Sequence, residues 1–141
     1  MENQETYIKL SKLVEKLKRS EDPKRKYEFI LWLGKKLKEP NRQFLVPENK
    51  VNGCVSEVFV KARIKNGKLY WEGYSDALIT KGLLAFLIDG LSDLTPMEVI
   101  NINKNFIEET GLKASLTPSR SNGFLNILLK MQSQAKQFLK V

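Results

Sequence analysis

Residues 55–74 have the sequence VSEVFVKARIKNGKLYWEGY, the stretch of the chain with the clearest strand pattern. In its first half, apolar side chains alternate with polar or charged ones, which is the period of a β-strand. The dipeptide Asn66-Gly67 then interrupts the alternation. A type I′ turn needs positive φ at both central residues, and Asn-Gly tolerates this best. The segment therefore predicts an antiparallel hairpin, with one strand from Val55 to Ile64 and a return strand from Lys68 to Tyr74.

Helical patterns lie on both sides of this hairpin, where apolar residues recur at three- and four-residue spacing. Helices are predicted over about residues 5–19, 23–38, 75–90 and 103–110, and in two segments that open at Thr95-Pro96 and Thr117-Pro118. Ser75 is expected to cap the third of these, and the aromatic side chains of Tyr27, Trp32 and Phe86 are expected in the core. The segregation of helices from strands predicts an α+β fold: a small antiparallel sheet of about three strands covered by helices.

Length and composition limit the number of domains. A chain of 141 residues with 42% hydrophobic and 28% charged residues has the size and composition of one globular domain, so we expect a single domain over residues 1–141. No apolar run approaches the roughly 20 residues that span a bilayer. The polar and acidic first residues do not resemble a secretory signal. We therefore expect a cytoplasmic protein without membrane association.

Two residue types restrict the chemistry that is possible. The sequence has no histidine and a single cysteine, Cys54. Without histidine, the usual Ser-His and Cys-His nucleophile pairs and most zinc sites are excluded, so no bound metal is expected. One cysteine excludes an internal disulfide and a CxxC redox pair. Cys54 is therefore the first candidate for any covalent chemistry.

The basic balance of the chain raises the possibility of a nucleic-acid partner. The formal net charge is +8, and a pI above about 9 is typical of nucleic-acid-binding domains. However, acidic residues are interleaved with the basic ones, and the densest basic run lies near residues 16–26. A solvated helix face accounts for such a run as well as a phosphate-binding surface does. A small basic nucleic-acid-binding module remains an alternative, but the interleaved charges favour a solvated helix face over a nucleic-acid partner.

Cys54 follows a turn-forming pair, Asn52-Gly53, and directly precedes the first predicted strand. A lone cysteine is often only a small buried hydrophobic residue. A thiol at the tip of a turn, in contrast, is well placed to be presented to a partner. Groups that could lower its pKa are the turn N–H groups of Gly53 and Val55, a helix N-terminus, or a nearby Lys or Arg.

Three motifs in this order resemble the SufE family of cysteine desulfuration proteins, over roughly residues 27–131. They are VNGCVSEV at 51–58, GYSDALITKGL at 73–83 and LTPSRSNG at 116–123. The resemblance implies the family's fold, which is related to the IscU-type scaffold proteins. It also implies a sulfur carrier: an accessory protein, not a free-standing enzyme, that accepts the persulfide sulfur of a cysteine desulfurase on Cys54.

The resemblance also implies the partners and the supporting residues. The desulfurase uses pyridoxal phosphate, while this chain binds no cofactor and passes sulfur to an iron–sulfur scaffold. An adaptor of the same fold that delivers sulfur to another cofactor-maturation enzyme is an alternative. Gly53, Val55 and Asp76 are expected to support the cysteine loop, although Asp76 could instead favour the N-terminus of a helix. Arg120 is expected to dock on the desulfurase.

Overall fold

The computed structural model describes residues 6–139. The helices and strands of this part of the chain are α1 Ile8–Lys18, α2 Pro23–Lys35, β1 Val58–Lys65, β2 Lys68–Ser75, α3 Leu78–Leu91, α4 Pro96–Ile100, α5 Phe106–Glu109 and α6 Pro118–Gln137. Three short 3-10 turns lie between them: η1 Arg42–Phe44, η2 Pro47–Asn49 and η3 Leu112–Ala114. The predicted α+β order is confirmed. The predicted start of the first helix at Glu5 lies outside the described residues.

The hairpin forms as its sequence predicts. β1 and β2 pair antiparallel, with Val58 opposite Ser75 and Lys65 opposite Lys68. Asn66 and Gly67 have φ values of 52° and 77°, as a type I′ turn requires. β1 begins at Val58, three residues later than predicted, because residues 51–57 form turns and bends.

The sheet of the described residues has two strands, where about three were predicted. A single bridge lies on the free side of each strand, Lys50 with Phe59 and Leu69 with Leu94. The buried side chain of Gln134 completes the edge of β1. Its amide accepts from the Ala62 N–H and donates to the Val60 carbonyl, both at 2.7 Å. This amide occupies hydrogen-bonding positions that a neighbouring strand would otherwise use.

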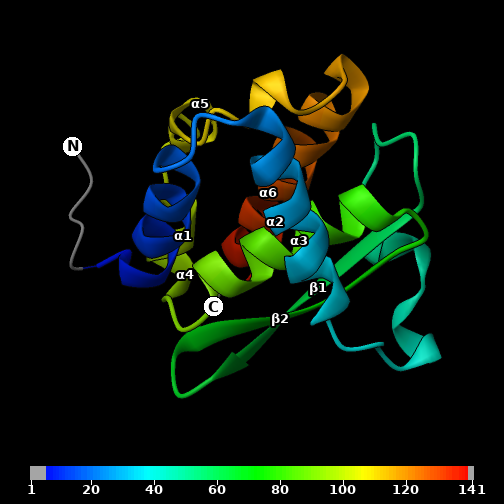
Figure 1. Ribbon diagram of the computed structural model, residues 1–141. Helices are drawn as coiled ribbons and strands as arrows, with labels where there is room; N and C mark the ends of the chain where they lie inside the picture. The colour runs from blue at the N-terminus through cyan, green and yellow to red at the C-terminus, as the bar shows by residue number, and fades with distance from the viewer. Residues whose placement is uncertain (1–5, 140–141) are drawn as a thin grey trace.

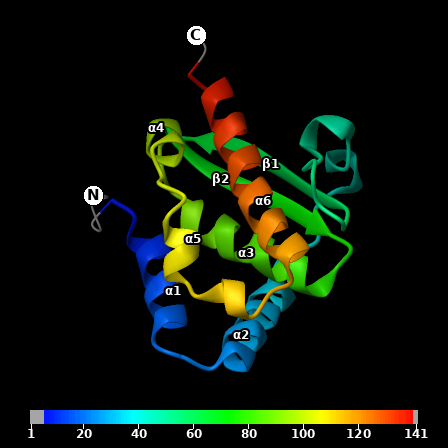
Figure 2. The ribbon, with the colours of Figure 1, turned by 90° about the horizontal axis from the view of Figure 1, so that it is seen from above.

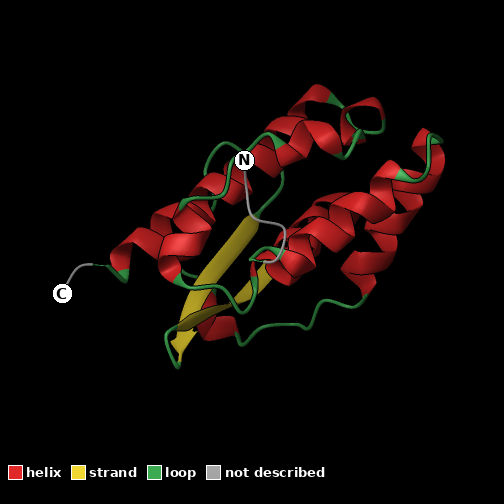
Figure 3. Cartoon of the chain, turned by 90° about the vertical axis from the view of Figure 1, so that its left-hand side faces the viewer, coloured by secondary structure: helices red, strands yellow, loops and turns green. Residues whose placement is uncertain are grey.

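The helices gather on one side of the sheet, which runs along the lower part of Figure 1. α3 is the central helix and contacts α1, α2, α6 and β2, while α6 crosses β1 (Figure 2). Figure 3 shows the narrow sheet against this helical layer. α2 and α3 approach so closely that a side chain on Gly82 would collide with the Ile30 carbonyl oxygen. This contact fixes the position of α3, whose N-terminal end lies beside the cysteine loop.

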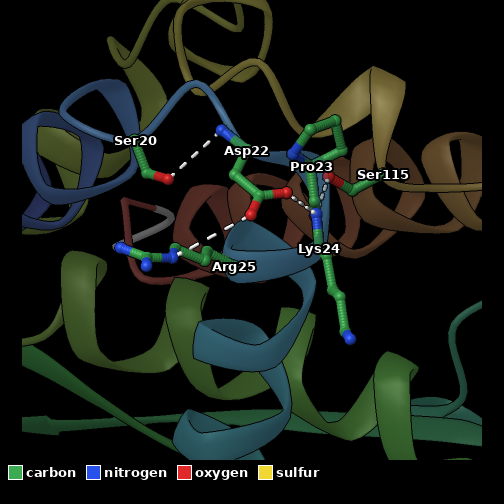
Figure 4. Close-up of polar contacts among 6 residues, drawn as sticks. All are labelled: Ser20, Asp22, Pro23, Lys24, Arg25 and Ser115. Atoms are coloured by element: carbon green, nitrogen blue, oxygen red, sulfur yellow. Dashed lines mark hydrogen bonds and ion pairs between the residues drawn. The ribbon is translucent and has the colours of Figure 1, made fainter.

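Local capping sets the start of α2, as the sequence predicts (Figure 4). The Asp22 carboxylate accepts from the Lys24 N–H at 3.0 Å and forms an ion pair with Arg25 at 3.9 Å. From the other end of the chain, the Ser115 hydroxyl donates to the Pro23 carbonyl at 2.7 Å. Pro23 at the first helical position supplies no N–H, so the cap leaves few backbone donors unsatisfied.

Two of the predicted core aromatics, both in the first half of the chain, were wrongly placed. Phe86 is fully buried, but Tyr27 and Trp32 are 37% and 49% exposed. Trp32 stacks on Phe29, and the Lys36 ammonium lies 4.2 Å from the Trp32 ring centre. α2 is thus rotated relative to the prediction.

The caps of the later helices agree with the sequence in two of three cases. Thr95 and Glu98 form the complete capping box of α4, and Thr117 caps α6 by accepting from the Arg120 N–H. α3, however, begins at Leu78 with Ala77 as its N-cap residue, and no side chain caps it. The predicted cap Ser75 is the last residue of β2, where its hydroxyl accepts from the Ala77 N–H at 3.3 Å.

Candidate functional site

Cys54 lies in a short loop that the strand pairing closes. The Val51 N–H donates to the Val58 carbonyl at 2.8 Å, so the residues between Val51 and Val58 form a closed loop. Within it, Gly53 has a φ of +83°, in the left-handed region that strongly favours glycine. We call residues 52–57 the cysteine loop. The sequence Asn52-Gly53 therefore has a direct structural role, because it turns the chain just before the thiol.

The Cys54 thiol faces α6. The Cys54 side chain is half-buried and packs on the main hydrophobic core. Its Sγ donates to the Gly123 carbonyl oxygen at 3.8 Å. A Cβ added at position 123 would lie 3.6 Å from Sγ, which is ordinary van der Waals contact and shows how close α6 lies to the sulfur. The thiol is partly sheltered in the free protein, and the shelter includes the backbone of α6.

Burial raises the pKa of the Cys54 thiol above its ordinary value. The cause is desolvation, which disfavours the charged thiolate. The sequence suggested groups that could lower this pKa, but in the structure desolvation by burial is the larger effect and the pKa is raised. At neutral pH the free protein therefore holds a protonated thiol, which is a poor nucleophile.

Asp76 joins α3 to the far end of the cysteine loop. Its carboxylate accepts from the Glu57 N–H at 3.0 Å, while its own N–H donates to the Glu57 carbonyl at 3.3 Å. It precedes α3 instead of lying in its first turn, where no acidic residue is found. Of the two roles considered from the sequence, the geometry corresponds to support of the cysteine loop.

Arg120 points inward in the free protein. Its Nη1 donates to the Thr80 hydroxyl at 2.8 Å, and Thr80 is only 4% exposed. The Thr80 hydroxyl also lies 3.4 Å from the Ser56 hydroxyl of the cysteine loop. Arg120 therefore links α6 to α3 beneath the loop, and its expected docking role remains a prediction.

Val55 and Leu78 are the most exposed large apolar residues of the described chain. Their exposed fractions are 81% and 75%. Val55 directly follows Cys54, and Leu78 opens α3 two residues after Asp76. The Val55 side chain thus faces solvent, and the expected role of Val55 in supporting the loop remains a prediction. Val55 and Leu78 offer exposed apolar surface directly after Cys54 and at the start of α3.

One further residue of this site was not found by sequence analysis. The Asn126 side-chain amide donates to the Gly53 carbonyl at 3.0 Å from the third turn of α6. The two residues are far apart along the chain, and asparagine within a helix gives no pattern that marks such a contact. Three segments therefore hold the cysteine loop: β1 through Val58, the turn before α3 through Asp76, and α6 through Asn126 and Gly123.

The described residues contain neither a metal-binding cluster nor a membrane-spanning segment. Among residues 6–139, no group of three or more His, Cys, Asp or Glu side chains could hold a metal ion. In the same part of the chain, no helix is long and apolar enough to cross a bilayer.

The fold and the site together define a class of protein: a small α+β domain that holds one half-buried cysteine in a loop braced by two helices. The sequence model of the SufE family, described as an Fe-S metabolism associated domain, matches residues 11–135. The chain therefore belongs to the SufE family, as the three motifs predicted, and its role lies in the sulfur chemistry of iron–sulfur metabolism.

Relatives of this chain include proteins from bacteria, plants and parasites. It is 50% identical to an uncharacterized SufE-like protein of Synechocystis sp., over 92% of this chain and 81% of the relative. It is 42% identical to SufE-like protein 1, chloroplastic/mitochondrial, of Arabidopsis thaliana, over 90% of this chain and 34% of the relative. Identity to the cysteine desulfuration protein SufE of Plasmodium falciparum is 35%, over 84% of this chain and 49% of the relative.

The chain thus spans between a third and a half of the plant and Plasmodium relatives. The organellar name of the plant relative leaves the cytoplasmic location of this chain a prediction. Among solved structures, the solution structure of a hypothetical protein from Thermus thermophilus matches with a TM-score of 0.81 and 25% identity. The match covers 94% of this chain and 97% of that one. The SufE-like fold class is thereby confirmed.

Proposed function

We propose that this protein accepts sulfur from the persulfide of a cysteine desulfurase on Cys54 and passes it to an iron–sulfur scaffold. The observation that carries the proposal is the single cysteine of a SufE-family chain, held in a loop that contacts α6 and the turn before α3. The Plasmodium relative named as a cysteine desulfuration protein supports the same reaction. The chain acts as an accessory to the desulfurase, whose pyridoxal phosphate supplies the preceding chemistry.

The transfer needs only one thiol on the acceptor. The Cys54 thiolate attacks the terminal sulfur of the donor persulfide, and a new bond forms between Cys54 Sγ and that sulfur. The donor sulfur–sulfur bond breaks, and the donor cysteine leaves as a thiolate. The transferred sulfur keeps its oxidation state, so no external oxidant or reductant is required. Because the chain has no second cysteine, the new persulfide cannot be discharged as an internal disulfide.

The apolar side chains beside Cys54 provide a surface on which the desulfurase docks. Val55, within the cysteine loop, and Leu78, at the start of α3, are both largely exposed. Burying each of them at an interface contributes about 1.5–3 kcal/mol from apolar area alone. Val55 is also adjacent to Cys54 in the chain, so contact with its side chain can move the loop that carries the thiol.

The proposal is tested by intact mass spectrometry after incubation with a cognate cysteine desulfurase and cysteine. We expect the mass of the wild-type protein to increase by one sulfur atom, and the increase to disappear after reduction. Cys54→Ser is the control and is expected to gain no sulfur and give no stimulation of the desulfurase. Sulfur uptake or stimulation at the wild-type level by the serine variant would refute the proposal.

A further inference from the structure

Asn126 contacts the cysteine loop through a direct hydrogen bond and through close packing against Gly53. The Asn126 side-chain nitrogen lies 3.0 Å from the Gly53 carbonyl oxygen. It also fills the space beside Gly53, because a Cβ added to Gly53 would lie 2.6 Å from it. The contact thus joins the third turn of α6 to the residue just before Cys54.

This contact constrains the backbone that carries the thiol. The Gly53 carbonyl and the Cys54 nitrogen belong to one planar peptide unit. When Asn126 holds this carbonyl in place, the peptide plane is held, and with it the direction of the Cys54 N–Cα bond. In this orientation Sγ lies against the Gly123 carbonyl of the same helix, 3.8 Å away. Rotation of the peptide unit would carry the thiol away from α6, and that rotation requires loss of the Asn126 bond.

We propose that Asn126 is a positioning residue that latches the cysteine loop shut, and that its bond to Gly53 breaks when the desulfurase docks. This inference rests on the proposed function. The Asp76 contact holds the opposite end of the loop, at Glu57, next to the paired strand. Release of the Asn126 end therefore frees Cys54 while the hairpin remains intact.

The latch is weak enough to be reversible. Both partners of the Asn126 bond are neutral, and Gly53 is exposed. One such hydrogen bond shifts an equilibrium between closed and open forms by about 2- to 10-fold. A latch of this strength keeps the thiol turned inward in the free protein without preventing a docked partner from opening the loop.

The first test uses the free protein and a thiol reagent. We expect Asn126→Ala to increase the labelling rate of Cys54 by about 2- to 10-fold. Asn126→Asp is expected to increase it at least as much, because a carboxylate cannot donate to the Gly53 carbonyl and repels it. Asn122→Ala is the matched control, since Asn122 is an exposed asparagine on the same helix with no contact to the loop among the described hydrogen bonds. Labelling of Asn126→Ala at the wild-type rate would overturn the proposal.

The second test measures stimulation of a desulfurase as a function of carrier concentration. If docking requires the open loop, the half-saturating concentration falls by the same factor as the labelling rate rises, while the maximal stimulation is unchanged. If Asn126 had only a structural role, the half-saturating concentration would not change in proportion to the labelling rate. Faster labelling with an unchanged half-saturating concentration would overturn the claim that the latch breaks on docking. Failure of all variants and the wild type to accept sulfur would instead refute the proposed function, and the labelling rates would still test the latch.

Discussion

Replacement of Arg120 is expected to lower the stability of the free domain as well as any docking affinity. Its guanidinium donates to the Thr80 hydroxyl at 2.8 Å, and Thr80 is almost fully buried in α3. Hydrogen bonds from charged donors contribute about 1.5–3 kcal/mol. Arg120 itself is half-exposed, so we expect Arg120→Ala to cost about 1–2 kcal/mol. For a domain of this size, that corresponds to a fall in Tm of about 3–8 °C.

A double-mutant cycle isolates this bond from the other effects of each substitution. Thr80→Val keeps the branched shape of the side chain but removes the acceptor. We expect the double variant Arg120→Ala with Thr80→Val to be more stable than the sum of the single changes predicts, by about 1 kcal/mol. The assay is urea denaturation of the four proteins followed by circular dichroism. Free energies of unfolding that add to within about 0.3 kcal/mol would refute the reasoning, because they would show that the bond contributes nothing.

The same four proteins separate the structural role of Arg120 from the docking role predicted from the sequence. Thr80→Val releases the guanidinium from its internal partner without removing it. If Arg120 also docks on the desulfurase, affinity falls in Arg120→Ala but not in Thr80→Val. Titration calorimetry against a cognate desulfurase measures both affinities. Equal loss of affinity in the two variants would assign Arg120 a structural role alone.

Three further predictions concern the cysteine loop and the sheet edge. Gly53→Ala should destabilise the loop by about 1–2 kcal/mol, because its φ is +83°, and should speed thiol labelling of Cys54. Gln134→Leu should lower the free energy of unfolding, measured in urea, by about 2–4 kcal/mol, because the Ala62 N–H and the Val60 carbonyl lose their hydrogen-bond partner. An unchanged unfolding midpoint would contradict this. Because burial raises the pKa of Cys54, alkylation of the folded protein should rise with pH at a higher midpoint than in the urea-unfolded chain. For the same reason, stability contributed by the protonated thiol is present below the unfolded pKa and is lost as pH rises through the folded pKa.

Features that depend on neighbouring residues were predictable from the sequence. The Asn66-Gly67 turn needs only two residues with positive φ, and both have it. The capping box of α4 needs only Thr95 and Glu98, and the start of α6 needs only Thr117 and Pro118. In each case the physical cause lies within four residues, so the local sequence contains it.

Features that depend on distant partners were not predictable. Lys26 is buried in α2, although a charged residue is usually exposed, and its ammonium donates to the Thr110 carbonyl at 2.8 Å. That carbonyl lies at the end of α5, and it needs a donor that only the folded arrangement brings near. With Lys26 and Ile30 inward, Tyr27 and Trp32 are turned toward solvent. The sequence showed an apolar stripe but not which rotation of the helix satisfies this carbonyl.

The site divides in the same way. Cys54 and the Gly53 turn could be located from the sequence, because the chain has one cysteine and one turn beside it. Asp76 was placed in a motif, but its acceptor role depends on the Glu57 N–H across the hairpin. The partners on α6 and α3 meet the loop only after those helices pack. Each of these contacts is one polar hydrogen bond, so hydrophobic periodicity in the sequence does not predict it.

The contacts around Cys54 favour a closed cysteine loop and a protonated thiol, and both affect the order of steps in sulfur transfer. Attack on a persulfide requires the thiolate. In the free protein, burial raises the pKa of Cys54, and the thiol donates to the Gly123 carbonyl. Both effects disfavour loss of the proton until the loop opens. We therefore expect opening to precede deprotonation, and deprotonation to precede transfer. We therefore expect the free thiol to react slowly with small oxidants and disulfides, and a partner that docks on Val55 and Leu78 to gain access to the thiolate.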